Sequence, residues 1–173
     1  MGYTGGSKVN PTYYTLGDHT ETVDIDYDPE ITSYENMLAL FWKHHDPTNR
    51  TSQQYKSVIF YHDAQQEKLA RESLKDAQQC QSKKIATVIV PATQFYEAEN
   101  YHQKYMLQQH PTLMSALNAV NITKSHICTR INGYLGANGK TKDFDKEWEI
   151  LGLNENMAEY IRGNMPRNRH GRF

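Results

Sequence analysis

Residues 55–91, YKSVIFYHDAQQEKLARESLKDAQQCQSKKIATVIVP, contain the pattern that decides the fold. The run 55–61 is rich in aromatic and β-branched residues, and the apolar run 85–90 ends at Pro91, so both runs are typical of strands. Between them, Asp63 is placed to cap a charged helix that continues to about Gln79. The stretch therefore predicts a strand, a helix and a second strand in succession.

The same alternation is predicted on the amino-terminal side of this stretch. Residues 20–27 alternate apolar and polar side chains, as in a half-buried strand, and this places Glu21 near the start of the strand. Thr32 and Glu35 fit a capping box in front of apolar residues at helical spacing, and residues 45–47 (HDP) end that helix.

Beyond residue 95 the signal is helical only. We expect helices over residues 95–109, 111–120, a short segment before Gly133, 144–151 and 154–162. Strands interleaved with helices, followed by helices alone, predict an α+β fold, a two-layer sandwich of a mixed sheet and helices with a helical carboxyl-terminal extension. We place the core at residues 1–110, the helical extension at 111–164 and a basic, flexible tail at 165–173.

Composition excludes several classes of partner. A chain of 173 residues can bury one core, and a net charge of -1 with a pI near 6.7 creates no field that attracts nucleic acid or acidic lipid. The three arginines of the tail are too few to indicate a nucleic-acid binder. No apolar run reaches membrane length and no signal peptide is readable. We expect a cytoplasmic or nuclear monomer that binds neither nucleic acid nor membrane.

The chain has two cysteines, Cys80 and Cys128, too few for the disulfide framework of a small secreted protein. Cys80 is predicted at the carboxyl end of a helix, where the helix dipole opposes a thiolate. His102 has no neighbouring Cys or second His at ligand spacing. The pair His44 and His45 lies beside Asp46 and continues the helix end, so we interpret it as structural. We therefore expect no bound metal or cofactor.

Seven blocks along the first 105 residues share an order with one known family. They are GYTGG (2–6), NPTY (10–13), HTE (19–21), YDP (27–29), HDPT (45–48), QYKS (54–57) and FYEAENYHQKY (95–105). In these blocks the chain resembles methionine sulfoxide reductase A, and its GDHTE and NGYLGANG segments resemble the animal, insect-type branch. The resemblance implies a ferredoxin-like core and reduction of methionine (S)-sulfoxide, in proteins and in free form, with thioredoxin as reductant.

The resemblance also implies roles for three residues. Glu21 matches the glutamate that protonates the leaving sulfoxide oxygen, and Tyr13 and Tyr55 match the tyrosines whose hydroxyls hydrogen-bond that oxygen. Such chemistry needs a carboxylic acid kept partly neutral beside aromatic groups, and phenols that donate without carrying charge. From spacing alone, a solvated carboxylate at the end of a strand is the favoured reading of Glu21, and a packing residue is the favoured reading of each tyrosine; the surrounding blocks decide for the roles in the site.

One part of the family pattern is not found in these residues. The match begins at Gly2, whereas the family carries a G-C-F-W motif with its nucleophilic cysteine before this point. We therefore expect the chain as given to be a truncated isoform that is inactive as a reductase. Cys128 is open to two readings, a resolving cysteine or a buried structural thiol. The alternative function is a catalytically silent module that binds oxidised methionine or a partner protein.

Overall fold

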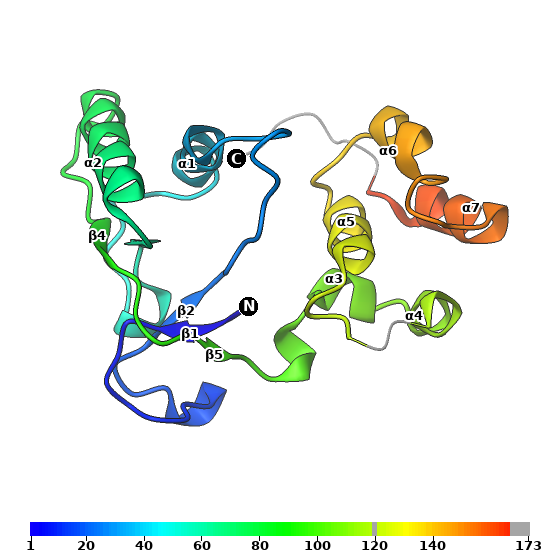
Figure 1. The fold of residues 1–173 in the computed structure, drawn as a ribbon, viewed down its shortest axis with the longest axis horizontal. Coiled ribbons are helices and arrows are strands. Elements are labelled where there is room, and N and C mark those ends of the chain that lie inside the picture. Colours follow the sequence, from blue (N-terminus) through cyan, green and yellow to red (C-terminus); the bar gives the residue numbers. More distant parts are fainter. Residues whose placement is uncertain (119–120, 167–173) are drawn as a thin grey trace. The chain divides into compact units, whose positions relative to one another are not determined.

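The computed structural model describes residues 1–118 and 121–166, which form two compact units, the first over residues 1–98 and the second over the described residues from Glu99 onward (Figure 1). Most of the expected basic tail and the end of the helix expected at 111–120 lie outside the described residues. The predicted α+β class is confirmed. In the described part of the chain, every helix is too short or too polar to cross a bilayer.

The first unit holds an antiparallel sheet that carries the amino terminus. Its strand order is β2-β1-β5, with β1 at Gly2–Thr4, β2 at Thr20–Thr22 and β5 at Tyr96–Glu97. In the register, Tyr3 of the central strand lies between Glu21 and Tyr96. Tyr3 is 1% exposed, so this central strand is fully covered.

A second, parallel sheet in the same unit confirms the predicted strand, helix and strand. Strand β3 (Val58–Tyr61) pairs in parallel with β4 (Val88–Pro91), and α2 (Ala64–Gln79) connects them. The Asp63 side chain accepts a hydrogen bond from the Gln66 amide at 2.8 Å, which is the predicted cap.

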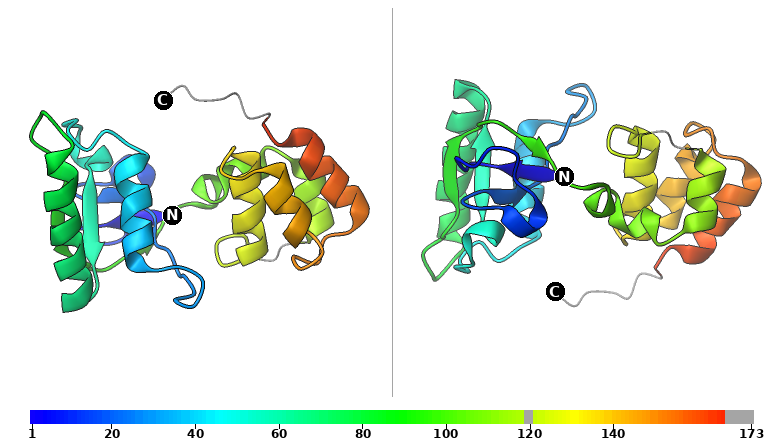
Figure 2. Two further views of the ribbon diagram at one scale, coloured as in Figure 1. Left: turned by 90° about the horizontal axis from the view of Figure 1, so that it is seen from above. Right: turned by 90° about the horizontal axis from the view of Figure 1, so that it is seen from below.

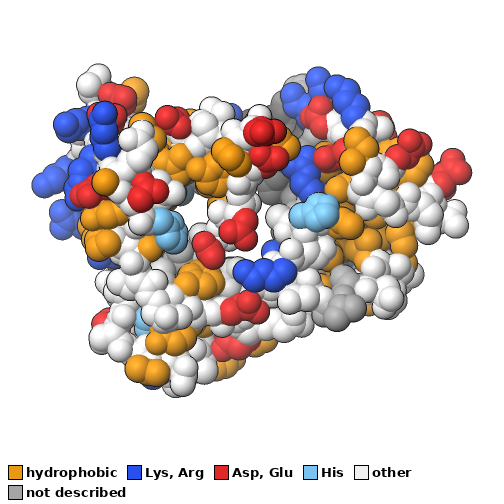
Figure 3. Space-filling view, in the orientation of Figure 1, with side chains coloured by type: hydrophobic (Ala, Val, Ile, Leu, Met, Phe, Trp, Pro, Cys, Tyr) orange, Lys and Arg blue, Asp and Glu red, His pale blue; other side chains and the backbone are white. Residues whose placement is uncertain are grey.

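Helices α1 (Tyr34–Lys43) and α2 pack against each other and enclose a core with the parallel sheet (Figures 1 and 2). Leu38, Ile59, Ala70 and Ile89 are its buried members. The predicted capping box at Thr32 is wrong by one residue, because Ser33 caps α1 by accepting from the Asn36 amide at 3.3 Å. Apolar side chains also reach the surface of the unit (orange in Figure 3). Ile31, for example, is 83% exposed.

The strand predicted over residues 20–27 is wrong in length, because β2 ends at Thr22. The ladder with β1 ends at the pair Gly2 and Thr22, and residues 23–27 have no strand partner within the described chain. Val23 and Ile25 are consequently 65% and 55% exposed. Alternating hydrophobicity is not enough to form a strand when no neighbour supplies hydrogen bonds.

The helix predicted over residues 95–109 is also wrong. This run divides into β5, a 3-10 turn at Asn100–His102 and the short helix α3 (Tyr105–Gln108). Pairing of β5 with β1 takes the first residues into the sheet, and the Ala98 amide donates to the Met1 carbonyl at 3.1 Å. Lys104, with φ of 45°, breaks the remaining helical path.

The second unit is helical, as expected, although its helix bounds differ from the predicted ones. It contains α3, α4 (Pro111–Leu117), α5 (His126–Leu135), α6 (Thr141–Glu147) and α7 (Glu155–Asn164). The helix expected to stop before Gly133 continues through it to Leu135. Helix α3 packs on α5, and the second unit begins at Glu99. The border expected after residue 110 therefore lies within this unit, between α3 and α4.

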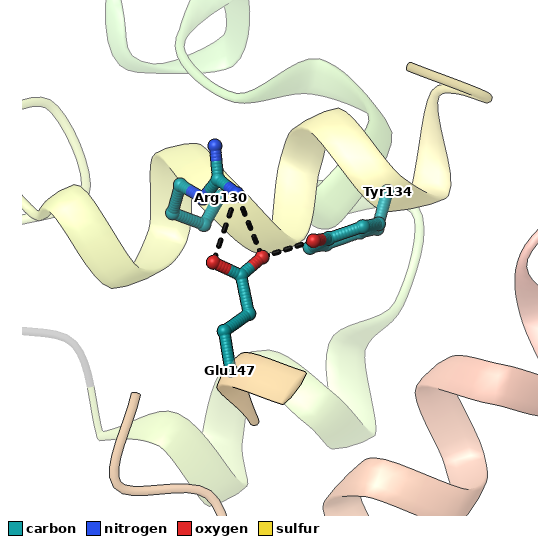
Figure 4. A network of polar contacts seen from close by, with 3 residues as sticks. All are labelled: Arg130, Tyr134 and Glu147. Atoms are coloured by element: carbon teal, nitrogen blue, oxygen red, sulfur yellow. Dashed lines mark hydrogen bonds and ion pairs between the residues drawn. The ribbon is translucent and has the colours of Figure 1, made fainter. Parts of the chain in front are cut away.

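Glu147 of α6 accepts hydrogen bonds from two side chains of α5, Arg130 and Tyr134 (Figure 4). Its carboxylate accepts from Arg130 at 2.7 and 2.8 Å and from the Tyr134 hydroxyl. Burial, followed by the hydrogen bond to Glu147, raises the pKa of Tyr134 to about 12. The Tyr134 ring in turn packs edge-on against Phe144, which is fully buried. The polar network therefore links α5 to α6 beside the helical core.

We expect Glu147→Gln to lower the free energy of unfolding by about 1–2 kcal/mol, because a charge-assisted acceptor for Arg130 and Tyr134 is lost. It should also bring the pKa of Tyr134 down towards 10. Urea unfolding and ultraviolet titration of the tyrosines measure the two effects. Glu149→Gln, at an exposed neighbour, is the matched control and should change neither quantity. Identical behaviour of the two variants would show that the network contributes nothing.

The pKa of Tyr134 is higher in the folded protein than in the unfolded chain, so the free energy of unfolding depends on pH. The neutral phenol is favoured in the native state, so its contribution is complete below pH 10 and is lost as pH rises from 10 to about 12.

Candidate active site

Glu21 occupies the middle of β2, opposite Tyr3 of β1. Its side chain is partly buried, and its carboxylate accepts a hydrogen bond from the Gln54 side-chain amide at 2.6 Å. This hydrogen bond holds the Glu21 carboxyl group in one orientation.

The two predicted tyrosines lie on short 3-10 turns. Tyr13 begins a turn (Tyr13–Thr15) capped reciprocally by Thr12 and Thr15, and Tyr55 ends another (Gln53–Tyr55). Their hydroxyl oxygens are 3.4 Å apart, although the residues are 42 positions apart in the chain. The structure therefore brings together two of the three residues selected from sequence.

A buried histidine fixes the loop that precedes Glu21. His19 is 1% exposed; its Nδ1 accepts from the Gly6 amide at 3.2 Å and its Nε2 donates to the Lys8 carbonyl at 2.7 Å. Next to it, the Asp18 carboxylate accepts from the Ser7 amide and hydroxyl, and these bonds lower the pKa of Asp18. The first loop of the chain is thus held against the start of β2.

A cavity of about 480 Å³ opens beside Glu21 and Tyr55. One part of its wall is apolar, formed by Val23, Ile25, Phe41 and Val58. The remaining lining residues are polar or charged: Glu21, Thr22, His45, Asp46, Asn49, Thr51, Tyr55, Lys56 and Ser57. Tyr13 reaches this site through its hydroxyl contact with Tyr55. An apolar wall facing a carboxylate and a phenol suits a small ligand with one polar and one apolar end.

Contact with Tyr13 changes the acidity of Tyr55. The hydrogen bond with Tyr13 is the main cause that raises the pKa of Tyr55, and the nearby Glu21 charge acts in the same direction. A phenol is protonated at neutral pH with or without this shift, so the Tyr55 hydroxyl can donate or accept a hydrogen bond at the cavity.

His45 was expected to have no role in a site, yet it lines the cavity. Its Nδ1 donates to the Phe41 carbonyl at 2.7 Å, and its Nε2 accepts from the Ser57 hydroxyl at 2.8 Å. Ser57 in turn is 2.8 Å from the Thr87 hydroxyl. These bonds join the end of α1 to β3. The HDP sequence identified a helix end and gave no sign that the ring would turn towards Ser57.

Neither cysteine is among the residues that line this cavity. Cys80 is exposed and follows the last residue of α2, as predicted, and Cys128 is 1% exposed within the core of the helical unit. Within the described ranges, no group of three or more His, Cys, Asp or Glu residues could hold a metal ion.

The family model described as peptide methionine sulfoxide reductase matches residues 1–132. The chain belongs to this family. The match includes the complete first unit, with Glu21, Tyr13 and Tyr55, and extends into α5.

Relatives include the peptide methionine sulfoxide reductases of Drosophila melanogaster and Brassica napus. The first is 41% identical over 165 residues, 92% of this chain and 67% of that protein. The second is 45% identical over 117 residues, 61% of this chain and 45% of that protein. The chain thus spans about two thirds of the Drosophila protein and less than half of the Brassica protein.

A similar solved structure is that of reduced Mxr1 from Saccharomyces cerevisiae. It is 30% identical in sequence, with a TM-score of 0.59, and the match covers 64% of this chain and 69% of Mxr1. Sequence and structure therefore place the chain in one family of oxidoreductases.

We expect Tyr13→Phe to lower the pKa of Tyr55, because the hydrogen bond that raises it most is removed. Tyrosine labelled with carbon-13 at Cζ lets NMR follow Tyr55 as pH is raised. Tyr14→Phe, at a neighbour that is 86% exposed, keeps the Tyr13 hydroxyl and should leave the Tyr55 titration in place. If the two variants titrate alike, the hydroxyl contact does not form in solution.

Proposed function

We propose that the chain is part of a peptide-methionine (S)-S-oxide reductase, which reduces methionine (S)-sulfoxide in proteins and in free form with thioredoxin as external reductant. The observation that carries this proposal is the grouping of a carboxylate and two phenols beside one cavity with an apolar wall. Membership of the peptide methionine sulfoxide reductase family indicates that the ligand of this grouping is a sulfoxide.

A methionine sulfoxide side chain has the two ends that this cavity accommodates. Its oxygen is a strong acceptor and would receive hydrogen bonds from the hydroxyls of Tyr13 and Tyr55, while its methyl group would lie against the apolar wall. Glu21, in its protonated form, would give its proton to the oxygen as the bond between sulfur and oxygen breaks.

The balanced step needs a thiol as well. A thiol and a sulfoxide become a sulfenic acid and a thioether, so the oxygen moves from the substrate sulfur to the enzyme sulfur, and a second thiol then converts the sulfenic acid to a disulfide with loss of water. Thioredoxin would reduce that disulfide. Because Cys80 and Cys128 are not in the cavity lining, we expect residues 1–173 alone to bind the sulfoxide without reducing it.

The binding half of this proposal is tested by calorimetric titration of the 173-residue chain with a short peptide containing methionine (S)-sulfoxide. We expect saturable binding, weaker binding of the matching methionine peptide, and an approximately fivefold loss in Tyr55→Phe, the worth of one hydrogen bond. Tyr14→Phe serves as the control. No saturation at millimolar peptide would reject the proposal.

A catalytically silent module that binds oxidised methionine is the second candidate, favoured by a cavity without a lining thiol. Peptide binding does not separate the two candidates, but turnover does. The endogenous protein, purified and supplied with thioredoxin and its reductase, reduces the peptide if it is the enzyme and leaves it oxidised if it is the module. Loss of that activity in Glu21→Gln would assign the proton donor.

A further inference from the structure

Three consecutive residues of one 3-10 turn contact three different parts of the candidate site. Gln53 hydrogen-bonds the strand that carries Glu21, Gln54 hydrogen-bonds the Glu21 carboxylate, and Tyr55 contacts the hydroxyl of Tyr13. Only the last of these residues was selected from sequence, so the turn does more in the structure than the resemblance implied.

Gln53 fixes the position of the turn. Its carbonyl accepts from the Thr20 hydroxyl at 3.0 Å, and its side-chain amide donates to the Asp18 carbonyl at 3.0 Å. On the other side, the Thr51 hydroxyl donates to the Tyr55 carbonyl at 2.6 Å. Since Thr20 is 2% exposed, the turn is attached to a rigid part of the sheet, and the residue that follows Gln53 has little freedom.

Gln54 contacts Glu21 directly. Within the residues that the structure describes, its Nε2 at 2.6 Å is the one hydrogen-bond donor recorded for the Glu21 carboxylate. The amide is neutral, so it orients the acid without adding a charge beside it. An amide has both a donor and an acceptor end, so after rotation its carbonyl oxygen can accept a hydrogen bond from the neutral carboxylic acid. The Gln54 amide can therefore hold the Glu21 carboxyl group in the same position whether that group is ionised or protonated.

We propose that Gln54 is a positioning residue, which holds the Glu21 carboxyl group at the cavity wall in the place where a bound sulfoxide oxygen meets Tyr55. This inference rests on the proposed function. It assigns to Gln54 an effect on substrate binding that is exerted through Glu21 and not through contact with the substrate.

The test is a double-mutant cycle with methionine, which has a similar length and no amide or carboxylate. Gln54→Met, Glu21→Met and the double variant are titrated with the methionine (S)-sulfoxide peptide, beside wild type. Gln65→Met, at an exposed position of α2, is the matched control. We expect Gln54→Met to weaken binding on the order of tenfold and the control to leave it unchanged. In the Glu21→Met background, the same substitution should have almost no effect.

The outcomes separate the two proposals. If wild type binds but Gln54→Met binds equally well, or its effect persists without Glu21, the positioning role is rejected and the proposed function stands. If wild type does not bind, the proposed function fails and the positioning role fails with it. Circular dichroism checks folding. Should Gln54→Met not fold, Gln54→Asn, whose amide is one methylene too short, carries the same expectation.

Discussion

The buried imidazole of His19 is the constraint on which the arrangement of the first unit depends. One ring nitrogen accepts from the Gly6 amide and the other donates to the Lys8 carbonyl, so a single neutral ring replaces the hydrogen bonds that an irregular loop would otherwise take from water. The backbone around it leaves no space, because a Cβ at Gly6 would lie 2.6 Å from the His19 amide nitrogen. With this loop fixed, Glu21 follows two residues later at a defined place.

From that fixed point, the site is built by short elements. Strand β2 is only three residues long, but its Thr20 hydroxyl donates a hydrogen bond to the 3-10 turn at Gln53–Tyr55. This turn places Gln54 against the Glu21 carboxylate and Tyr55 against the Tyr13 hydroxyl. Small, rigidly attached turns place polar atoms accurately, which a proton donor and its hydrogen-bonding partners require. The apolar wall then comes from α1, β3 and the segment after β2.

Sequence patterns predicted the regular elements and failed where tertiary pairing decided the outcome. The periodicity of α2 and the apolar runs of β3 and β4 were sufficient, because a helix cap and strand composition are local properties. A helix was predicted over residues 95–109, but β5 at its start pairs with a strand more than 90 residues away. Likewise, motif blocks selected Glu21, Tyr13 and Tyr55, whereas Gln54 and His45 could be found only from contacts between distant segments.

The central claim is that Glu21, Tyr13 and Tyr55 form one site for a sulfoxide oxygen. A crystal structure of the 173-residue chain with bound N-acetyl-methionine (S)-sulfoxide methylamide tests it most directly. The account predicts the oxygen within hydrogen-bond distance of the Tyr55 hydroxyl and close to Tyr13 and the Glu21 carboxyl group, with the methyl group against Phe41 and Val58. A ligand bound away from these residues, or with its oxygen directed to solvent, would contradict the account.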